Sequence, residues 1–112
     1  MSEAITIKVT AGFDRWLKAL KNLQARAKVI ARIRSAGKGN FGDCKPVGEG
    51  VSEMRIHGRS GYRVYFMQSG LTVYILLVGG TKAMQQQDIA RAKELARAIK
   101  EGNYEHGDNP GF

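Results

Sequence analysis

The segment Leu71–Val78, LTVYILLV, places the strongest constraint on how this chain can fold. It is the most apolar run of the sequence, and Gly79 and Gly80 follow it directly. A strand of this composition at the edge of a sheet would expose an apolar template for pairing with other chains. We therefore predict that this segment is a central strand with a neighbouring strand on each side.

Four further segments show the apolar patterns of short strands. They are Ile5–Thr10, Cys44–Val47, Val51–His57 and Tyr62–Phe66. Three other segments, at about residues 13–23, 24–36 and 84–100, place apolar residues three or four positions apart, as amphipathic helices do. The order of these elements predicts an α+β fold, in which one face of a small antiparallel β-sheet packs against an N-terminal helical hairpin and a C-terminal helix.

The length of 112 residues is that of one domain, which we assign to residues 1–102, followed by a flexible tail over residues 103–112. No apolar run approaches the roughly 20 residues of a membrane-spanning helix, and the first residues lack the layout of a signal peptide. The single cysteine, Cys44, has no partner for an internal disulfide. We therefore expect a cytoplasmic protein with no membrane partner.

The net charge of +8 is concentrated in one part of the sequence. Residues 15–38 contain eight basic residues and no acidic residue, whereas the other ten basic residues are balanced by ten acidic ones. The eight are Arg15, Lys18, Lys21, Arg26, Lys28, Arg32, Arg34 and Lys38. Such a basic block indicates a nucleic acid, an acidic protein or an anionic membrane as a partner, and a solvated helix face is an equally ordinary interpretation.

The segment 51–66 is predicted to be a hairpin of two strands around the turn Gly58-Arg59-Ser60-Gly61. Alternate side chains of a strand point to opposite faces of the sheet. The apolar set comprises Met54, Ile56, Val64 and Phe66. With this set facing the core, the opposite face carries Arg55, His57, Arg63 and Tyr65. The sequence therefore predicts a cationic and aromatic sheet face.

Cations gathered on a sheet face suit a phosphodiester as ligand. Lys82 follows the central strand and Lys45 belongs to a neighbouring one, so both are candidates to join Arg55 and Arg63. Cleavage of RNA without a metal needs a base for the 2′-hydroxyl, cations for the crowded phosphate and an acid for the leaving oxygen. The two arginines would bind the phosphate oxygens and stabilise the transition state.

His57 is the candidate for proton transfer, because histidine is the residue type that ordinarily serves as an acid or base near neutral pH. Tyr65 is the candidate to stack on a base. No metal or cofactor is predicted, since His57 and His106 are far apart in sequence and no acidic cluster accompanies either. A simpler interpretation, that arginine and histidine on this face serve only solubility, remains equally open.

Several short motifs along the chain carry a resemblance to a known family. They are Phe13-Asp14-Arg15-Trp16-Leu17, Gly39-Asn40, Gly42-Asp43, Lys45-Pro46-Val47-Gly48-Glu49-Gly50-Val51, Glu53-Met54-Arg55-Ile56-His57, Gly61-Tyr62-Arg63-Val64-Tyr65-Phe66, and Gly79-Gly80 with Lys82, Gln85, Asp88 and Ile89. In this order, over about residues 5–100, the chain resembles the RelE/ParE superfamily of toxins from type II toxin–antitoxin systems. Within it, the chain is most similar to the HigB-like addiction-module killer proteins.

The resemblance implies a RelE-like domain that presents basic residues to mRNA on the ribosome. Matched by position, it implies catalytic roles for Arg63, Arg55 and Lys82, to which the chemical argument adds His57. It also implies a helix-turn-helix antitoxin as partner, with operator DNA bound only through the toxin–antitoxin complex. The implied ribosome or antitoxin contacts are Lys18, Lys21, Arg26, Lys28, Arg32 and Arg34.

The chain departs from the common pattern of this family at the hairpin turn. Where Gly-Pro-Gly is usual, it has Arg59-Ser60-Gly61, which adds a cation next to the predicted site. Arg59 therefore joins Lys45 and Tyr65 as a predicted RNA-binding residue. Because the superfamily holds both ribosome-dependent mRNA endonucleases and gyrase poisons, a ParE-like gyrase inhibitor is the alternative, and a non-enzymatic RNA-binding module is a third.

Overall fold

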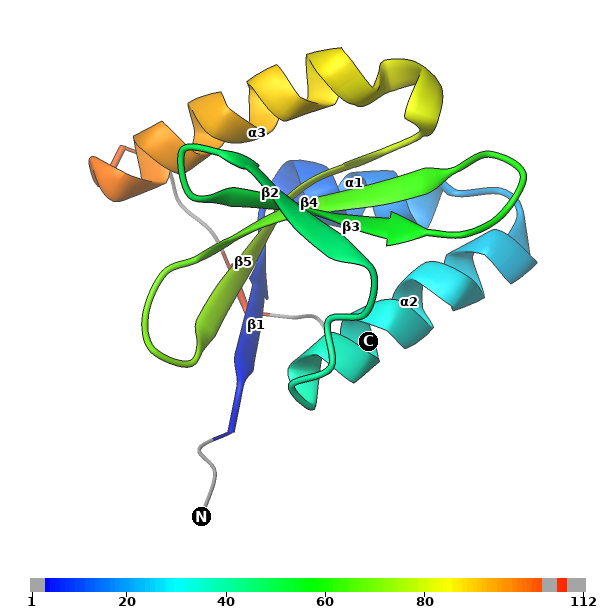
Figure 1. Ribbon diagram of the computed structural model, residues 1–112, viewed down its shortest axis with the longest axis horizontal. Helices are drawn as coiled ribbons and strands as arrows, with labels where there is room; N and C mark the ends of the chain where they lie inside the picture. The colour runs from blue at the N-terminus through cyan, green and yellow to red at the C-terminus, as the bar shows by residue number, and fades with distance from the viewer. Residues whose placement is uncertain (1–3, 104–106, 109–112) are drawn as a thin grey trace.

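The most apolar segment forms β5 (Val73–Gly80), and it lies inside the sheet as predicted. In the computed structural model, which describes residues 4–103 and 107–108, β5 pairs with β4 (Tyr62–Gln68) on one side and β1 (Thr6–Val9) on the other. The strand order is β2-β3-β4-β5-β1-β6, with β2 at Cys44–Gly48, β3 at Val51–Ile56 and β6 at Gly107–Asp108. Figure 1 shows β5 and β1 side by side.

The α+β fold class is confirmed, but the sheet is mixed rather than wholly antiparallel. Strands β2 to β5 follow one another as antiparallel neighbours, whereas β1 runs parallel to β5. The parallel pairing arises because the chain leaves β1 through two helices and reaches β5 only after three further strands. The edge strand β2 contains Pro46, which fits the edge because proline has no N–H to donate to a ladder.

The two N-terminal helices form as separate elements, α1 (Ala11–Ala19) and α2 (Leu23–Gly37). Thr10 caps α1 by accepting a hydrogen bond from the N–H of Phe13 at 3.1 Å, and its hydroxyl donates to the carbonyl of Leu77 at 2.8 Å. Asn22 caps α2 by accepting from the N–H groups of Gln24 and Ala25. Asn22 therefore divides the two helices of the predicted hairpin.

Both faces of the sheet are covered, which differs from the predicted packing of all helices on one face. One core lies between the sheet and α1–α2 and includes Phe13, Val29, Met54 and Val64. The other lies under α3 (Gln85–Lys100), which follows a short 3₁₀ turn, η1 (Lys82–Met84). Its buried residues are Val51, Tyr65, Met67, Ile75, Leu77, Ala92, Leu95 and Ala96. In Figure 1, α3 crosses one face while α2 lies on the other.

The reason for two covered faces is visible in the strands themselves. In β4 and β5, the residues that point to one face of the sheet and those that point to the other are both mostly apolar. Each face of the sheet must therefore be removed from water. Within the predicted tail, Gly107–Asp108 pairs antiparallel with β1. The rest of that tail, residues 104–106 and 109–112, lies outside the described residues. No helix in the described part of the chain has the length and apolar character needed to cross a membrane.

Candidate functional site: a buried carboxylate with two arginines

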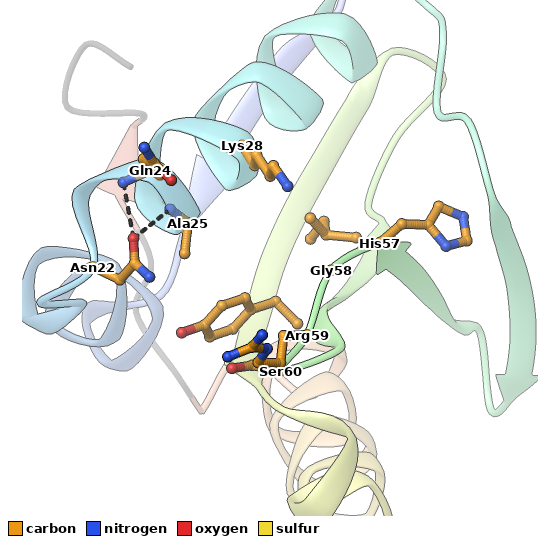
Figure 2. A pocket seen from close by; sticks show the side chains of 10 residues that line it. Asn22, Gln24, Ala25, Lys28, His57, Gly58, Arg59 and Ser60 are labelled. Atoms are coloured by element: carbon orange, nitrogen blue, oxygen red, sulfur yellow. Dashed lines mark hydrogen bonds between the residues drawn. The ribbon is translucent and has the colours of Figure 1, made fainter.

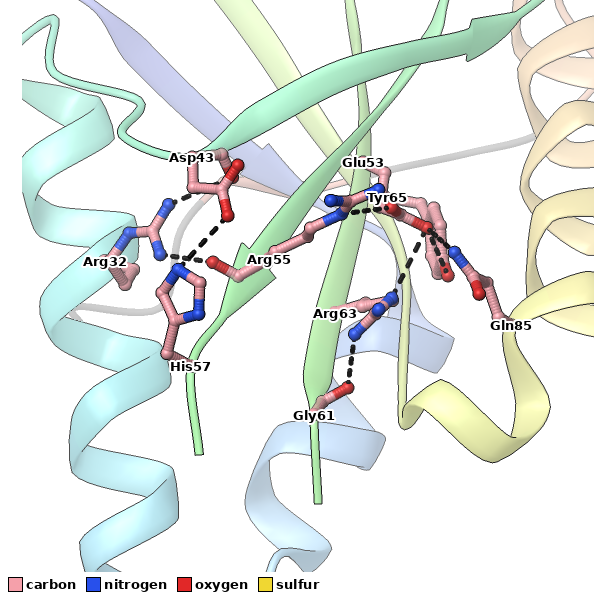
Figure 3. Close-up of polar contacts among 9 residues, drawn as sticks. All are labelled: Arg32, Asp43, Glu53, Arg55, His57, Gly61, Arg63, Tyr65 and Gln85. Carbon is pink, nitrogen blue, oxygen red and sulfur yellow. Dashed lines mark hydrogen bonds and ion pairs between the residues drawn. The ribbon is translucent and has the colours of Figure 1, made fainter. Parts of the chain in front are cut away.

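A fully buried carboxylate, Glu53 of β3, is the centre of the candidate site. A charge removed from water is tolerated only where hydrogen bonds and opposite charges replace the solvent. Glu53 Oε1 accepts a hydrogen bond from Arg55 Nε at 3.1 Å. Its Oε2 accepts from the Tyr65 hydroxyl at 3.1 Å and from Gln85 Nε2 at 2.7 Å (Figure 3). Strands β3 and β4 and the first residue of α3 thus meet on one carboxylate.

The protonation of Glu53 follows from these partners. Burial raises the pKa of its carboxyl, but the hydrogen bonds from Gln85, Arg55 and Tyr65 and the positive charge of Arg63 lower it by more. The net pKa therefore lies below the ordinary value, and Glu53 is an anion at neutral pH. A buried anion of this kind is a poor general base and a good anchor for cations.

Arg55 and Arg63 are direct partners in the register of β3 and β4, so their side chains lie on the same face of the sheet. Arg63 Nε lies 3.6 Å from Glu53 Oε2, an ion-pair distance, and its Nη1 donates to the carbonyl of Gly61 at 2.8 Å. The side chain of Arg63 is 11% exposed and that of Arg55 is 34% exposed. The prediction that these two arginines share one face is confirmed.

Arg55 is the arginine of this pair that can reach a ligand most directly. Its contact with Glu53 uses only Nε. Among the described residues, its terminal nitrogens have no hydrogen-bond partner, so the outer edge of the guanidinium is available for a bidentate contact. Glu53 therefore orients the Arg55 guanidinium and leaves its terminal N–H groups available to a ligand.

The predicted lysines lie beside this group. Lys45 of β2 is the register partner of Glu53, so its exposed side chain starts from the same face of the sheet. Lys82 is exposed at the start of η1, and its N–H donates to the carbonyl of Ser60 at 3.4 Å. A β-carbon on Gly61 would lie 3.1 Å from Lys82 Cβ and 3.3 Å from Arg63 Nη1. Lys82 and Arg63 thus flank the same glycine.

His57 does not join the two arginines, which corrects the prediction of a shared face. Strand β3 ends at Ile56, so the alternation of a strand no longer directs the next side chain. The His57 ring is 82% exposed, and its Nε2 lies 3.1 Å from Asp43 Oδ2. Figure 3 shows it beside Arg32, apart from the group around Glu53. The candidate group for proton transfer therefore does not lie beside the two arginines.

Tyr65 is also placed differently from the prediction. Its side chain is fully buried in the core under α3, and its hydroxyl is bound to Glu53. Burial and the nearby charge of Glu53 raise the pKa of the Tyr65 hydroxyl far above its usual range. Without an exposed ring face it has no surface on which a base can stack, and its role is to hold Glu53.

Arg32 is the member of the basic block that the structure turns inward. Its guanidinium donates to the backbone carbonyls of Phe41, at 2.9 Å, and of Asp43 and Arg55. It therefore links α2 to the loop before β2 and to the end of β3, whereas the resemblance implies that Arg32 contacts the ribosome or the antitoxin. Exposed positions are retained by Lys18, Lys21, Lys28 and Arg34. Arg26 is half-buried, and its Nη1 donates to the Lys18 carbonyl at 3.2 Å.

Three polar residues near the arginines were not singled out as site residues from the sequence: Glu53, Gln85 and Asp88. Asp88 packs so closely on Gly80 that a β-carbon there would overlap its carboxylate, and burial raises the pKa of the Asp88 carboxyl. The available signal for Glu53 was its position two residues before Arg55, on the same face of the predicted strand. This position assigns Glu53 to the sheet face of Arg55 but does not predict that its side chain is buried.

The arrangement around Glu53 has the properties of an anion-binding surface. Arg55, Lys45 and Lys82 are at least partly exposed, while Arg63 lies deeper and is fixed by two contacts. Cations held in place before a ligand arrives can stabilise developing negative charge without first being reorganised. In chemical terms the site suits a phosphate group. Among the described residues, no three His, Cys, Asp or Glu side chains gather in a way that could hold a metal ion.

The fold and this site define a small α+β protein whose mixed sheet carries a buried carboxylate bound to two arginines. The chain is 50% identical to an uncharacterized protein of Haemophilus influenzae (strain ATCC 51907 / DSM 11121 / KW20 / Rd) over 95 residues, which are 85% of this chain and 96% of the relative. This chain belongs to the same family as that protein. No family model matches the chain, and no solved structure matches it.

Proposed function

We propose that this protein is the toxin of a type II toxin–antitoxin system, a cytoplasmic RelE-like enzyme that cleaves mRNA on the ribosome without a metal or cofactor. A helix-turn-helix antitoxin would neutralise it, and operator DNA would be bound only through their complex. The observation that carries the proposal is the pair Arg55–Arg63, held on one sheet face by the buried carboxylate of Glu53. The motifs of residues 5–100 support the choice of family.

The proposed chemistry assigns a role to each cation according to its exposure. Arg55 and Lys82 contact the phosphate, because both reach solvent at the same end of the β3–β4 pair. Arg63 stabilises the additional charge of the transition state from its deeper position. The exposed lysines and arginines of residues 15–38 supply salt-sensitive contacts to ribosomal RNA or to the acidic part of the antitoxin.

One observation favours a second function, that of a ParE-like gyrase inhibitor. His57 contacts Asp43 at 3.1 Å and stands apart from the arginines, so among the described residues the sheet face with the arginines has no histidine for proton transfer. A toxin that only binds gyrase needs no such group. Cleavage by this chain would instead depend on charge stabilisation and on the orientation of the 2′-hydroxyl.

Primer extension on cellular transcripts after induction separates the two functions. We expect codon-linked cuts with the wild type and their loss in Arg63→Ala. Because Arg63 is largely buried and its loss would leave Glu53 with fewer partners, Lys82→Ala is the second variant, since an exposed lysine can be removed without disturbing the core. Arg91→Ala, which removes one exposed charge from α3, is the matched control and should cut normally.

The outcome that opposes the proposal is equally specific. Growth arrest with intact transcripts and trapped gyrase–DNA cleavage complexes would establish the gyrase inhibitor instead. RNA binding without any cut and without growth arrest would leave the RNA-binding module.

A further inference from the structure

A second basic hollow lies on the other side of the hairpin turn from Arg63. It has a volume of 270 Å³ and opens between the first turns of α2 and the tip of the β3–β4 hairpin. Its polar lining includes Asn22, Gln24, Lys28, Arg59 and Ser60. Figure 2 shows Lys28 reaching from α2 toward the hairpin, with Arg59 and Ser60 at the turn.

The charges in this hollow are of one sign. Lys28 and Arg59 are both exposed. Lys28 Nζ lies close to the turn, because a β-carbon added to Gly58 would be 3.9 Å from it. Among the residues that the structure describes, no acidic side chain lines the hollow. His57 also lines the hollow, and its Nε2 lies 3.1 Å from Asp43 Oδ2. Two cations therefore face the hollow without a bound carboxylate.

The walls of the hollow also suit a nucleotide. Tyr62 is half-buried and packs edge-on against Trp16 with ring centroids 6.0 Å apart, so its position is fixed. Ile56 adds an apolar surface beside it. The N–H groups of Gln24 and Ala25 in the first turn of α2 already donate to Asn22 Oδ1, so the cations are the groups that would bind an anion.

The turn 58–61 connects this hollow to the arginine site. Gly58, Arg59 and Ser60 line the hollow, whereas the carbonyl of Ser60 accepts a hydrogen bond from the backbone N–H of Lys82 and that of Gly61 accepts one from Arg63 Nη1. The two groups of cations thus lie on opposite sides of one four-residue turn. Successive phosphates of a single strand that crosses the turn would meet first one group and then the other.

We propose that the hollow lined by Lys28 and Arg59 binds the phosphate of a nucleotide next to the one held at Arg55, Arg63 and Lys82. The inference rests on the proposed function and names a further contact for the same RNA strand. It assigns Arg59 and Lys28 to RNA backbone binding at a defined place. It also gives the unusual turn sequence a purpose, since glycine in place of Arg59, as in the usual Gly-Pro-Gly, would remove one of the two cations.

Nuclear magnetic resonance titration of the purified protein tests the site directly. We expect uridine 5′-monophosphate to shift the backbone amides of Gly58 and Ser60, and uridine without phosphate to leave them unchanged. Lys28→Ala should weaken the nucleotide-dependent shifts by about threefold to tenfold, as the loss of one charge-assisted contact predicts. Arg91→Ala removes the same charge from α3 and should titrate as the wild type does. If uridine shifts the same amides, if nothing shifts them, or if both variants behave alike, the proposal is wrong.

Binding of a short single-stranded RNA gives a second measurement. The slope of log affinity against log salt should fall by about 0.7 in Lys28→Ala and stay constant in Arg91→Ala. A Lys28→Ala protein that keeps its RNA slope but releases its antitoxin would assign the hollow to the antitoxin and overturn the proposal. These measurements need no ribosome, so they can fail while the wild type still cleaves mRNA, or succeed when it does not.

Discussion

Gln85 Nε2 donates a 2.7 Å hydrogen bond to Glu53 Oε2, which joins the first residue of α3 to a carboxylate 32 positions earlier in the chain. The same oxygen, Glu53 Oε2, also accepts a hydrogen bond from the Tyr65 hydroxyl and lies at ion-pair distance from Arg63. One carboxylate thus contacts the first residue of α3 and both arginines. The stability of the fold and the placement of the two arginines are therefore coupled at Glu53.

Replacement of Glu53 by glutamine should destabilise the protein strongly. The Glu53→Gln substitution keeps the volume but removes the negative charge that compensates Arg63, whose side chain is 11% exposed. Breaking one partner of a buried ion pair costs about 3 kcal/mol or more. Urea unfolding at neutral pH measures the loss. Glu94→Gln, which removes an exposed carboxylate 4.0 Å from Arg91, is the control and should change stability by less than about 0.5 kcal/mol. Equal effects in the two variants would show that Glu53 anchors nothing.

The stability difference between the wild type and Glu53→Gln should depend on pH. The pKa of Glu53 is lower in the folded protein than in the unfolded chain, so the folded state binds fewer protons as the pH falls. The stability that Glu53 contributes is therefore complete above its ordinary value of 4.5 and is lost as the pH falls through the lower folded-state pKa. The difference in unfolding free energy between wild type and Glu53→Gln should shrink as the pH is lowered from 6 toward 2, in urea titrations at each pH. A difference that grew on acidification would contradict this assignment.

The sequence predicted the parts of this fold that depend on periodicity. The apolar run at Leu71–Val78 identified the central strand, and the alternation of Met54 and Val64 identified the face that packs on α1 and α2. Alternation, however, assigns a residue to a face and cannot say what covers it. Tyr65 was assigned to the correct face, which Glu53 shares as the residue two positions before Arg55, yet the burial of both depends on α3, which is distant in the chain.

The errors at single residues have related causes. His57 was placed by extending the alternation one residue past the end of β3, where a contact with Asp43 directs the ring instead. Arg32 has the helical position of a surface cation, but the three carbonyls that it binds belong to a loop and a strand end whose positions no local pattern specifies. Periodicity describes an element, whereas these contacts lie between elements.

Arg32 provides a prediction about the junction of α2 with the sheet. Arg32→Lys keeps the charge but cannot bridge the carbonyls of Phe41, Asp43 and Arg55, because an ammonium lacks the planar fork of a guanidinium. We expect a loss of about 1–2 kcal/mol, the net value of one or two hydrogen bonds. Arg34→Lys on the exposed face of the same helix should be close to neutral. Thermal and urea unfolding of both variants measure the difference, and equal stabilities would mean that the bridge contributes nothing.

Gly79 supplies a prediction about the contact between α1 and the central strand. A β-carbon at this position would overlap the ring of Trp16, which lies directly over the backbone of β5. Gly79→Ala should therefore displace Trp16 and Tyr62, which is packed against it, and reduce stability by about 1–3 kcal/mol through overpacking. Gly37→Ala is the control, because a β-carbon there would meet only Ile7 Cγ1 at 3.8 Å, an ordinary contact. Tryptophan fluorescence during urea unfolding reports both the movement of the ring and the loss of stability.

Since Tyr62 forms a wall of the hollow beside Lys28, Gly79→Ala should also weaken the binding of uridine 5′-monophosphate. An unchanged affinity in the destabilised variant would show that this aromatic wall plays no part in binding.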